Sequence, residues 1–179
     1  DSISITPAIP NTTDTLLCNV GVTELDGDTL TESYSWLNTT TGMILGSSSS
    51  LTLSSDVVSP GETVECQYSV TDGVDSDGDS STVYVANTGP TILSVDVTPT
   101  VAFNNTVLTC TIDVDDPDQL GYTGAYVWTN DSTGATLGTA ETLLLDATLA
   151  SPSDDISCSA TAIDPSGAAG SLSNQIMLS

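Results

Sequence analysis

The chain of 179 residues contains no lysine, arginine or histidine, although it has 24 aspartates and glutamates. Its formal net charge at pH 7 is therefore −24. Without basic side chains, the chain cannot bind nucleic acid or anionic lipid through charge. The absences also exclude a Ser-His-Asp triad and a Schiff-base lysine. Repulsion among the carboxylates must be met by water, salt or bound cations.

Long apolar runs and helical periodicity are absent as well. No stretch of about 18 apolar residues occurs, so we expect no membrane insertion in this segment. Thr, Val and Ser are plentiful, and hydrophobic residues alternate with polar ones, which predicts strands and almost no helix. In the first half of the chain we expect strands at residues 3–6, 15–22, 32–38, 43–46, 50–54, 63–71 and 82–86.

One frame of cysteine and tryptophan occurs twice. Cys18, Trp36 and Cys66 recur 92 positions later as Cys110, Trp128 and Cys158. The same offset relates further pairs: Tyr34 and Tyr126, Asn38 and Asn130, Gly42 and Gly134, Leu51 and Leu143, Ser59 and Ser151, and Asp72 and Asp164. A fixed period indicates duplicated modules, which usually belong to longer arrays.

The frame resembles that of immunoglobulin-like and polycystic-kidney-disease-type repeats of secreted bacterial and archaeal surface proteins. The matching residues are the two cysteine pairs, Tyr34-x-Trp36, Tyr126-x-Trp128, Pro60-Gly61, and the Asn-x-x-Pro sequence at Asn87. The resemblance implies an all-β chain of two tandem immunoglobulin-like β-sandwiches, each with one inter-sheet disulfide. We expect one domain at residues 1–87, a short linker at 88–91 and a second domain at 92–179.

The implied disulfides are Cys18–Cys66 and Cys110–Cys158; the alternative is four reduced thiols in the cores. Persistent disulfides require an oxidising compartment, so the pattern favours a secreted or cell-surface location. Each expected unit has about 90 residues, which is close to the usual size of an immunoglobulin sandwich.

Acidic residues gather in the segments expected between the second and third strands and between the last two strands of each unit. Because such loops meet at one end of an immunoglobulin sandwich, several carboxylates should converge there, and Ca²⁺ is the ion that oxygen ligands of this kind bind. The predicted calcium ligands are Asp26, Asp28, Asp72, Asp75, Asp77, Asp79, Asn87, Asp113, Asp115, Asp116, Asp118 and Asp164. The alternative is that these residues form ordinary polar turns.

Two details refine the calcium hypothesis. The run from Asp75 to Asp79 has alternate aspartates, but Ala86 stands where an EF-hand has its closing glutamate, so only a looser hairpin site is expected. Asn87 lies between the units and could complete coordination there. Zinc and redox metals are not expected, because histidine is absent and the cysteines are committed to the cores.

Four Asn-x-Ser/Thr sequences are candidate glycosylation sites. They begin at Asn11, Asn38, Asn104 and Asn130. Asn38 and Asn130 fall in equivalent hairpin turns, and the pattern is the acceptor sequence for N-linked sugar.

These features predict a non-catalytic protein. The first hypothesis is a structural and adhesive module of an extracellular surface fibre or filament, rigidified by disulfides and calcium, that associates with itself or extends into a longer array. Glycans or cell-surface ligands are further possible partners. The alternative is a carbohydrate-binding or spacer module of a larger secreted hydrolase, for which Tyr84, Phe103 and Tyr122 are the available outside rings. A third reading ascribes the acidity to a saline habitat.

Overall fold

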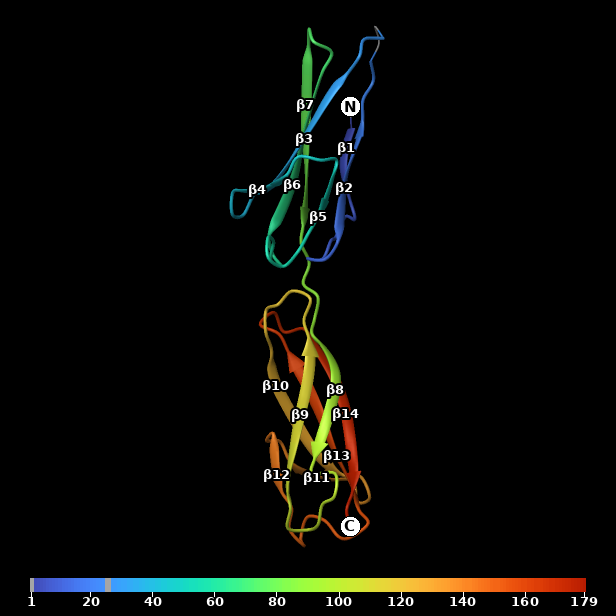
Figure 1. Cartoon of the computed structure of the whole chain (residues 1–179), viewed down its shortest axis with the longest axis vertical. Helices are drawn as coiled ribbons and strands as arrows, with labels where there is room; N and C mark the ends of the chain where they lie inside the picture. The colour runs from blue at the N-terminus through green and yellow to red at the C-terminus, as the bar shows by residue number, and fades with distance from the viewer. Residues whose placement is uncertain (1, 25–26) are drawn as a thin grey trace. The chain divides into compact units, whose positions relative to one another are not determined.

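A computed structural model describes residues 2–24 and 27–179 of the chain. The chain divides into two compact units, Asp1–Thr88 and Gly89–Ser179. The described residues form strands and no helix, and within them no helix is long and apolar enough to cross a membrane. Figure 1 shows the strands of each unit.

The first unit contains seven strands in two sheets. They are β1 (Ser2–Thr6), β2 (Thr15–Gly21), β3 (Thr31–Asn38), β4 (Met43–Gly46), β5 (Ser50–Thr52), β6 (Thr63–Thr71) and β7 (Ser76–Tyr84). One sheet has the order β1-β2-β5 and the other β4-β3-β6-β7. All of the pairings between these strands are antiparallel.

The second unit repeats this arrangement. Its strands are β8 (Thr91–Thr98), β9 (Val107–Asp115), β10 (Thr123–Asn130), β11 (Ala135–Gly138), β12 (Thr142–Leu144), β13 (Asp155–Ile163) and β14 (Ala169–Met177). They form sheets of order β12-β9-β8 and β11-β10-β13-β14. The 92-residue repeat therefore reproduces strand order as well as sequence, and the predicted pair of immunoglobulin-like sandwiches is confirmed.

Each unit is pinned by the predicted disulfide. Cys18 is bonded to Cys66 and Cys110 to Cys158, so the structure contains no free cysteine. Each bond joins the second strand of one sheet to the sixth strand of the unit in the other sheet. The alternative of four reduced thiols is therefore wrong.

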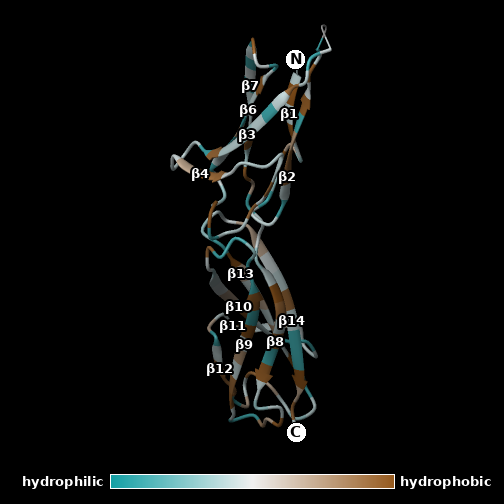
Figure 2. Cartoon of the chain, turned by 45° about the horizontal axis from the view of Figure 1, so that its top comes forward, coloured by the Kyte–Doolittle hydropathy of each residue, from teal (hydrophilic) through white to brown (hydrophobic). Residues whose placement is uncertain are grey.

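The cores form where the alternating residues predicted them. Trp36 and Trp128 are fully buried beside the disulfides, and each indole N–H donates to a backbone carbonyl, that of Ser48 or of Ala140. Hydrophobic and hydrophilic residues alternate along individual strands, as β8 shows in Figure 2. This two-residue period places one side of each strand against the facing sheet.

Two of the expected boundaries are wrong at acidic residues, and smaller differences occur elsewhere, since β5 ends at Thr52 and not at residue 54. The last strand of the first unit was expected at residues 82–86, but β7 begins at Ser76. Asp77 and Asp79 therefore belong to a strand and pair with Val70 and Tyr68 of β6. Similarly, Asp113 and Asp115 were expected in a loop but lie in β9.

Candidate functional site

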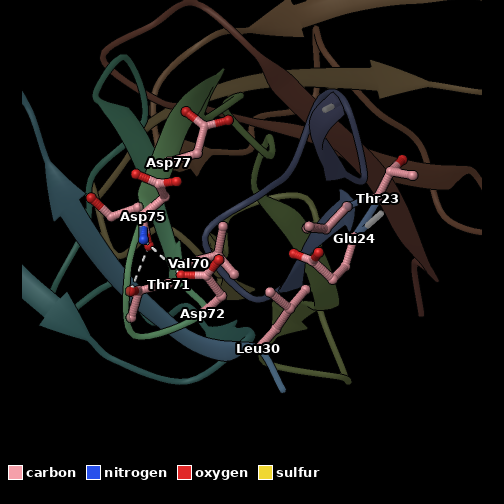
Figure 3. A pocket seen from close by; sticks show the side chains of 10 residues that line it. Thr23, Glu24, Leu30, Val70, Thr71, Asp72, Asp75 and Asp77 are labelled. Carbon is pink, nitrogen blue, oxygen red and sulfur yellow. Dashed lines mark hydrogen bonds between the residues drawn. The ribbon is translucent and has the colours of Figure 1, made fainter. Parts of the chain in front are cut away.

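The acidic end of the first unit contains an open cleft of about 210 Å³. Glu24 and Leu30 come from the connection between β2 and β3, whereas Asp72, Asp75 and Asp77 come from the end of β6 and the start of β7. Figure 3 shows these two groups on opposite sides of the cleft, with Val70 between them. The predicted convergence of the two acidic loops is therefore present in this unit.

Asp72 is held in place by the backbone of its own loop. Its Oδ1 accepts hydrogen bonds from the N–H groups of Val74 and Asp75, both at 2.7 Å. Both bonds lower the pKa of the Asp72 carboxyl, and the bond from Val74 has the larger effect. Asp72 therefore stays ionised at neutral pH and presents negative charge to the cleft, which does not suit a general acid.

The remaining predicted ligands of the first unit are less concentrated. Asp79 lies outside the cleft and lines a smaller hollow with Ile3 and Tyr68. Asp28 is exposed, Asn87 is half-buried, and Asp26 lies outside the described residues. Asp77 and Asp79 each accept a hydrogen bond from the next residue's N–H within β7, so these two aspartates of the run from Asp75 to Asp79 lie in a strand.

In the second unit the acidic residues differ sharply in burial. Asp118 and Asp164 are each only 4% exposed, whereas Asp113 and Asp115 are exposed on β9. The Oδ1 of Asp164 accepts hydrogen bonds from the N–H groups of Ser166 and Ala168 and from the Ser166 hydroxyl. This carboxylate therefore organises the turn between β13 and β14.

The two carboxylate oxygens of Asp116 differ in their hydrogen bonding. Its Oδ1 accepts the N–H of Asp118, but its Oδ2 is buried and has no hydrogen-bond partner. Among the residues that the structure describes, no three or more His, Cys, Asp or Glu side chains are already gathered as a metal site. A cation at either acidic end would therefore need backbone carbonyls and water in addition to carboxylates.

Two of the four sequons are corrected by the structure. Asn38 and Asn130 are 0% and 1% exposed, and their side-chain nitrogens donate to Glu62 and Asp154 at 2.8 Å. An N-linked sugar attaches to that same nitrogen, so the folded chain has no room for a glycan at either position. Asn11 and Asn104 are half-buried and stay predicted sites.

The buried asparagines form a motif that sequence reasoning missed. In the second unit, Asp154 Oδ2 accepts hydrogen bonds from the side-chain amide of Asn130 and from the N–H of Ser151. Both bonds lower the pKa of the Asp154 carboxyl, and the bond from Ser151 has the larger effect. Glu62 holds Asn38 and the N–H of Ser59 in the same way. The signal was available, since asparagine, serine and carboxylate all recur at the 92-residue offset.

A second polar cluster spans β3 and β6 of the first unit. The hydroxyls of Tyr34 and Tyr68 donate to the two oxygens of Glu32, and the tyrosine rings lie 5.2 Å apart. Burial, and then the Glu32 carboxylate, raise the pKa of Tyr68 to about 12. Both phenols therefore stay neutral and act as hydrogen-bond donors.

The outside rings expected for sugar binding are exposed but dispersed. Tyr84, Phe103 and Tyr122 are 59%, 53% and 45% exposed. Phe103 precedes β9 and Tyr122 follows it, so they lie beyond opposite ends of one strand, and Tyr84 belongs to the other unit. Phe103 and Tyr122 therefore do not form a shared platform.

Comparison with known proteins concerns the fold alone. No protein-family model matches the chain, and no curated protein matches it. An amphioxus IgVJ-C2 molecule is 10% identical with a TM-score of 0.45, over 94% of this chain and 97% of that chain. The first three domains of the Hoc outer capsid protein of bacteriophage RB49 are 17% identical with a TM-score of 0.37, over 99% and 58%. The ectodomain of mouse nectin-like molecule 4 is 12% identical with a TM-score of 0.40, over 99% and 63%.

Proposed function

We propose that the chain is a non-catalytic structural and adhesive module of an extracellular surface assembly. The observation that carries the proposal is the pair of disulfide-bonded sandwiches, together with the ionised Asp72 carboxylate in the cleft of the first unit. Disulfides of this kind persist in oxidising surroundings, outside the cytosol. The two units supply a duplicated scaffold, and its function lies in the contacts made by its surface.

Calcium is the proposed stabilising ion, and the second unit offers the stronger support. Asp118 and Asp164 are almost completely buried, and Asp116 Oδ2 is buried without a hydrogen-bond donor. The sequence contains no basic side chain that could compensate such charges. Burial of an ionised carboxylate costs several kcal/mol unless a positive partner is supplied, and Ca²⁺ accepts six to eight oxygen ligands.

Calcium is expected to raise the melting temperature of the second unit more than sodium at equal ionic strength. At a free concentration about 100 times Kd, one site contributes about 2.7 kcal/mol. This corresponds to roughly 10–20 °C for a domain of this size. Calorimetric melting in CaCl₂, MgCl₂ and NaCl measures the effect.

The variant Asp116→Asn should reduce the calcium response, and Asp56→Asn, an exposed change between β5 and β6, should leave it intact. Equal melting temperatures in CaCl₂ and in ionic-strength-matched NaCl would show that the acidity reflects general adaptation to salt instead.

Self-association through strand edges is the proposed route to a fibre. β1 and β7 of the first unit each pair with only one neighbour and so leave one edge of backbone groups unpaired. Because the net charge opposes contact between copies, we expect the average mass to rise with protein concentration, and more steeply in calcium or at high salt. Sedimentation velocity over a hundredfold concentration range measures this. A single monomeric species under all of these conditions would contradict the fibre.

A further inference from the structure

One candidate glycosylation sequence lies in a well-defined turn of the second unit. The N–H of Phe103 donates to the Thr106 hydroxyl at 2.9 Å, and the N–H of Thr106 donates to the Phe103 carbonyl at 3.0 Å. Asn104 and Asn105 are therefore the two central residues of a β-turn that precedes β9. The acceptor sequence Asn104-Asn105-Thr106 thus lies on a turn, with an aromatic residue directly before it.

The surroundings of Asn104 suit a sugar, unlike those of two other sequon residues. Asn38 and Asn130 are fully buried, and their side-chain amides donate to carboxylates. Asn104 is only half-buried, and the ring of Phe103 beside it is 53% exposed. A sugar on Asn104 therefore projects from the surface next to an open aromatic ring.

The corresponding turn of the first unit is built differently. The N–H of Asn11 donates to Asp14 Oδ2 at 2.8 Å, and the N–H of Asp14 donates to the Asn11 carbonyl at 3.2 Å. Asn11 therefore takes the place of Phe103, as the 92-residue offset also indicates, and the next residue of the turn, Thr12, is fully buried. The residue before Asn11 is Pro10, so this acceptor is not preceded by an aromatic ring.

Exposed apolar side chains flank Asn104 on both sides. Val101, Phe103 and Val107 lie within three residues of it in the chain, and Leu144 of β12 pairs with Val107 of β9. All four apolar side chains are between 53% and 63% exposed. A group of exposed apolar side chains is a typical site of contact with another group, and here the acceptor asparagine lies within it.

We propose that Asn104 carries an N-linked sugar whose first pyranose ring packs on Phe103 and covers this apolar surface. The Cα atoms of neighbouring residues are about 3.8 Å apart, so the first sugar lies within reach of the Phe103 ring. The C–H groups on one face of a pyranose are apolar, and their burial against an aromatic ring is favourable. The inference goes beyond the adhesive function and shares with it only the location outside the cytosol.

The modification needs a lipid-linked glycosyl diphosphate as donor and a transferase that acts during export. The Nδ2 of Asn104 forms a bond to the anomeric carbon of the sugar, the bond from that carbon to the diphosphate oxygen breaks, and the lipid diphosphate leaves. One of the two protons on Nδ2 passes to a base of the transferase. The product is a neutral amide, so the sugar is attached without a change in the charge of the side chain.

The test compares the full chain secreted from a eukaryotic host that attaches N-linked sugars with the same chain made in a bacterial periplasm. Mass spectrometry of chymotryptic peptides should find sugar on Asn104 in most of the secreted molecules. Calorimetry should give a melting temperature of the second unit roughly 4–8 °C higher with the glycan, the shift expected for one aromatic packing contact in a domain of this size.

Two enzymes locate the effect within the glycan. Endoglycosidase H trims it to the first N-acetylglucosamine, and the rise in melting temperature should remain. Peptide N-glycosidase F removes every sugar, and the rise should disappear. The second enzyme leaves Asp in place of Asn104, a change that is nearly neutral at a half-buried turn position.

Phe103→Ala tests the role of the ring. Sugar should still attach to Asn104, but the glycan-dependent rise should be lost. Tyr122→Ala, which removes an exposed ring directly before β10 of the same unit, should keep the rise. Each variant is compared with its own deglycosylated form, so the effect of the substitution on the unmodified fold cancels.

Three results would overturn the inference: a bare Asn104 in the secreted protein, equal melting temperatures with and without the glycan, or a rise that persists in Phe103→Ala. If one of these occurs while calcium-dependent melting or self-association is found, the glycan inference alone is wrong. If calcium-dependent melting and self-association are both absent while the glycan stabilises the second unit, the adhesive function alone is contradicted.

Discussion

Replacing Cys110 and Cys158 together by alanine is expected to lower the free energy of unfolding of the second unit by about 4 kcal/mol. The bond closes a loop between residues 48 positions apart, and loss of a cross-link of this length frees the unfolded chain by about that amount. For a domain of about 90 residues the melting temperature should fall by roughly 15–30 °C. Alanine avoids burying a hydroxyl at two positions that are fully buried.

The first unit supplies the matched control for this experiment. Its own bond, Cys18–Cys66, has the same separation, so the same double replacement there should shift only the transition of the first unit. Differential scanning calorimetry distinguishes the two transitions. Unchanged melting in both double variants would mean that hydrophobic burial alone holds the sandwiches together.

The substitution Asn130→Asp is expected to destabilise the second unit by about 3 kcal/mol at pH 7, because it leaves an uncompensated buried charge. The Asn130 amide now donates to Asp154 at 2.8 Å and to the carbonyl of Leu149 at 3.2 Å. The carboxylate oxygen that replaces this nitrogen would face the same two acceptors, one of them the charged Asp154, whereas the other oxygen would keep the N–H of Thr133. Chemical denaturation of the variant measures the loss.

The pH dependence of this loss has a defined sign. In the unaltered chain the pKa of Asp154 is lowered, so its contribution is present at neutral pH and disappears as pH falls through the lowered pKa. In the variant, two facing carboxyls raise each other's pKa, and protonation of one restores a donor. The difference between the two proteins should therefore shrink on acidification.

A half-buried sequon residue provides the control for Asn130→Asp. Asn104→Asp removes another acceptor sequence of the second unit, in a loop before β9, and should change stability by less than about 0.5 kcal/mol. If both substitutions have equal small effects, the buried hydrogen bonds of Asn130 do not stabilise the fold.

Much of the fold could be predicted because one pattern occurs twice. The repeat fixes Cys18, Trp36 and Cys66 in the first unit and their equivalents in the second, and alternation of apolar residues then assigns the inward faces. The disulfides follow from the frame. Bounds such as those of β4 and β6 were correct because strong alternation and clear turn residues delimit them.

The errors occur where distant parts of the chain decide the local structure. β7 begins with Ser-Asp-Gly-Asp, which has low strand propensity, and it is a strand because its backbone pairs with β6 along its whole length. Asn38 looked like a surface acceptor, but its burial depends on Glu62, 24 residues further along.

The placement of the two disulfides limits how far the protein can lengthen under tension. Each bond joins residues 48 positions apart. The residues between the two cysteines of a bond therefore cannot extend when the chain is pulled, even after every sheet has unfolded. At about 3.3–3.6 Å per residue, the two locked loops together remove roughly 300 Å of contour length. Under force, modules of this kind can therefore extend only over a short distance before the disulfide bonds themselves resist further extension.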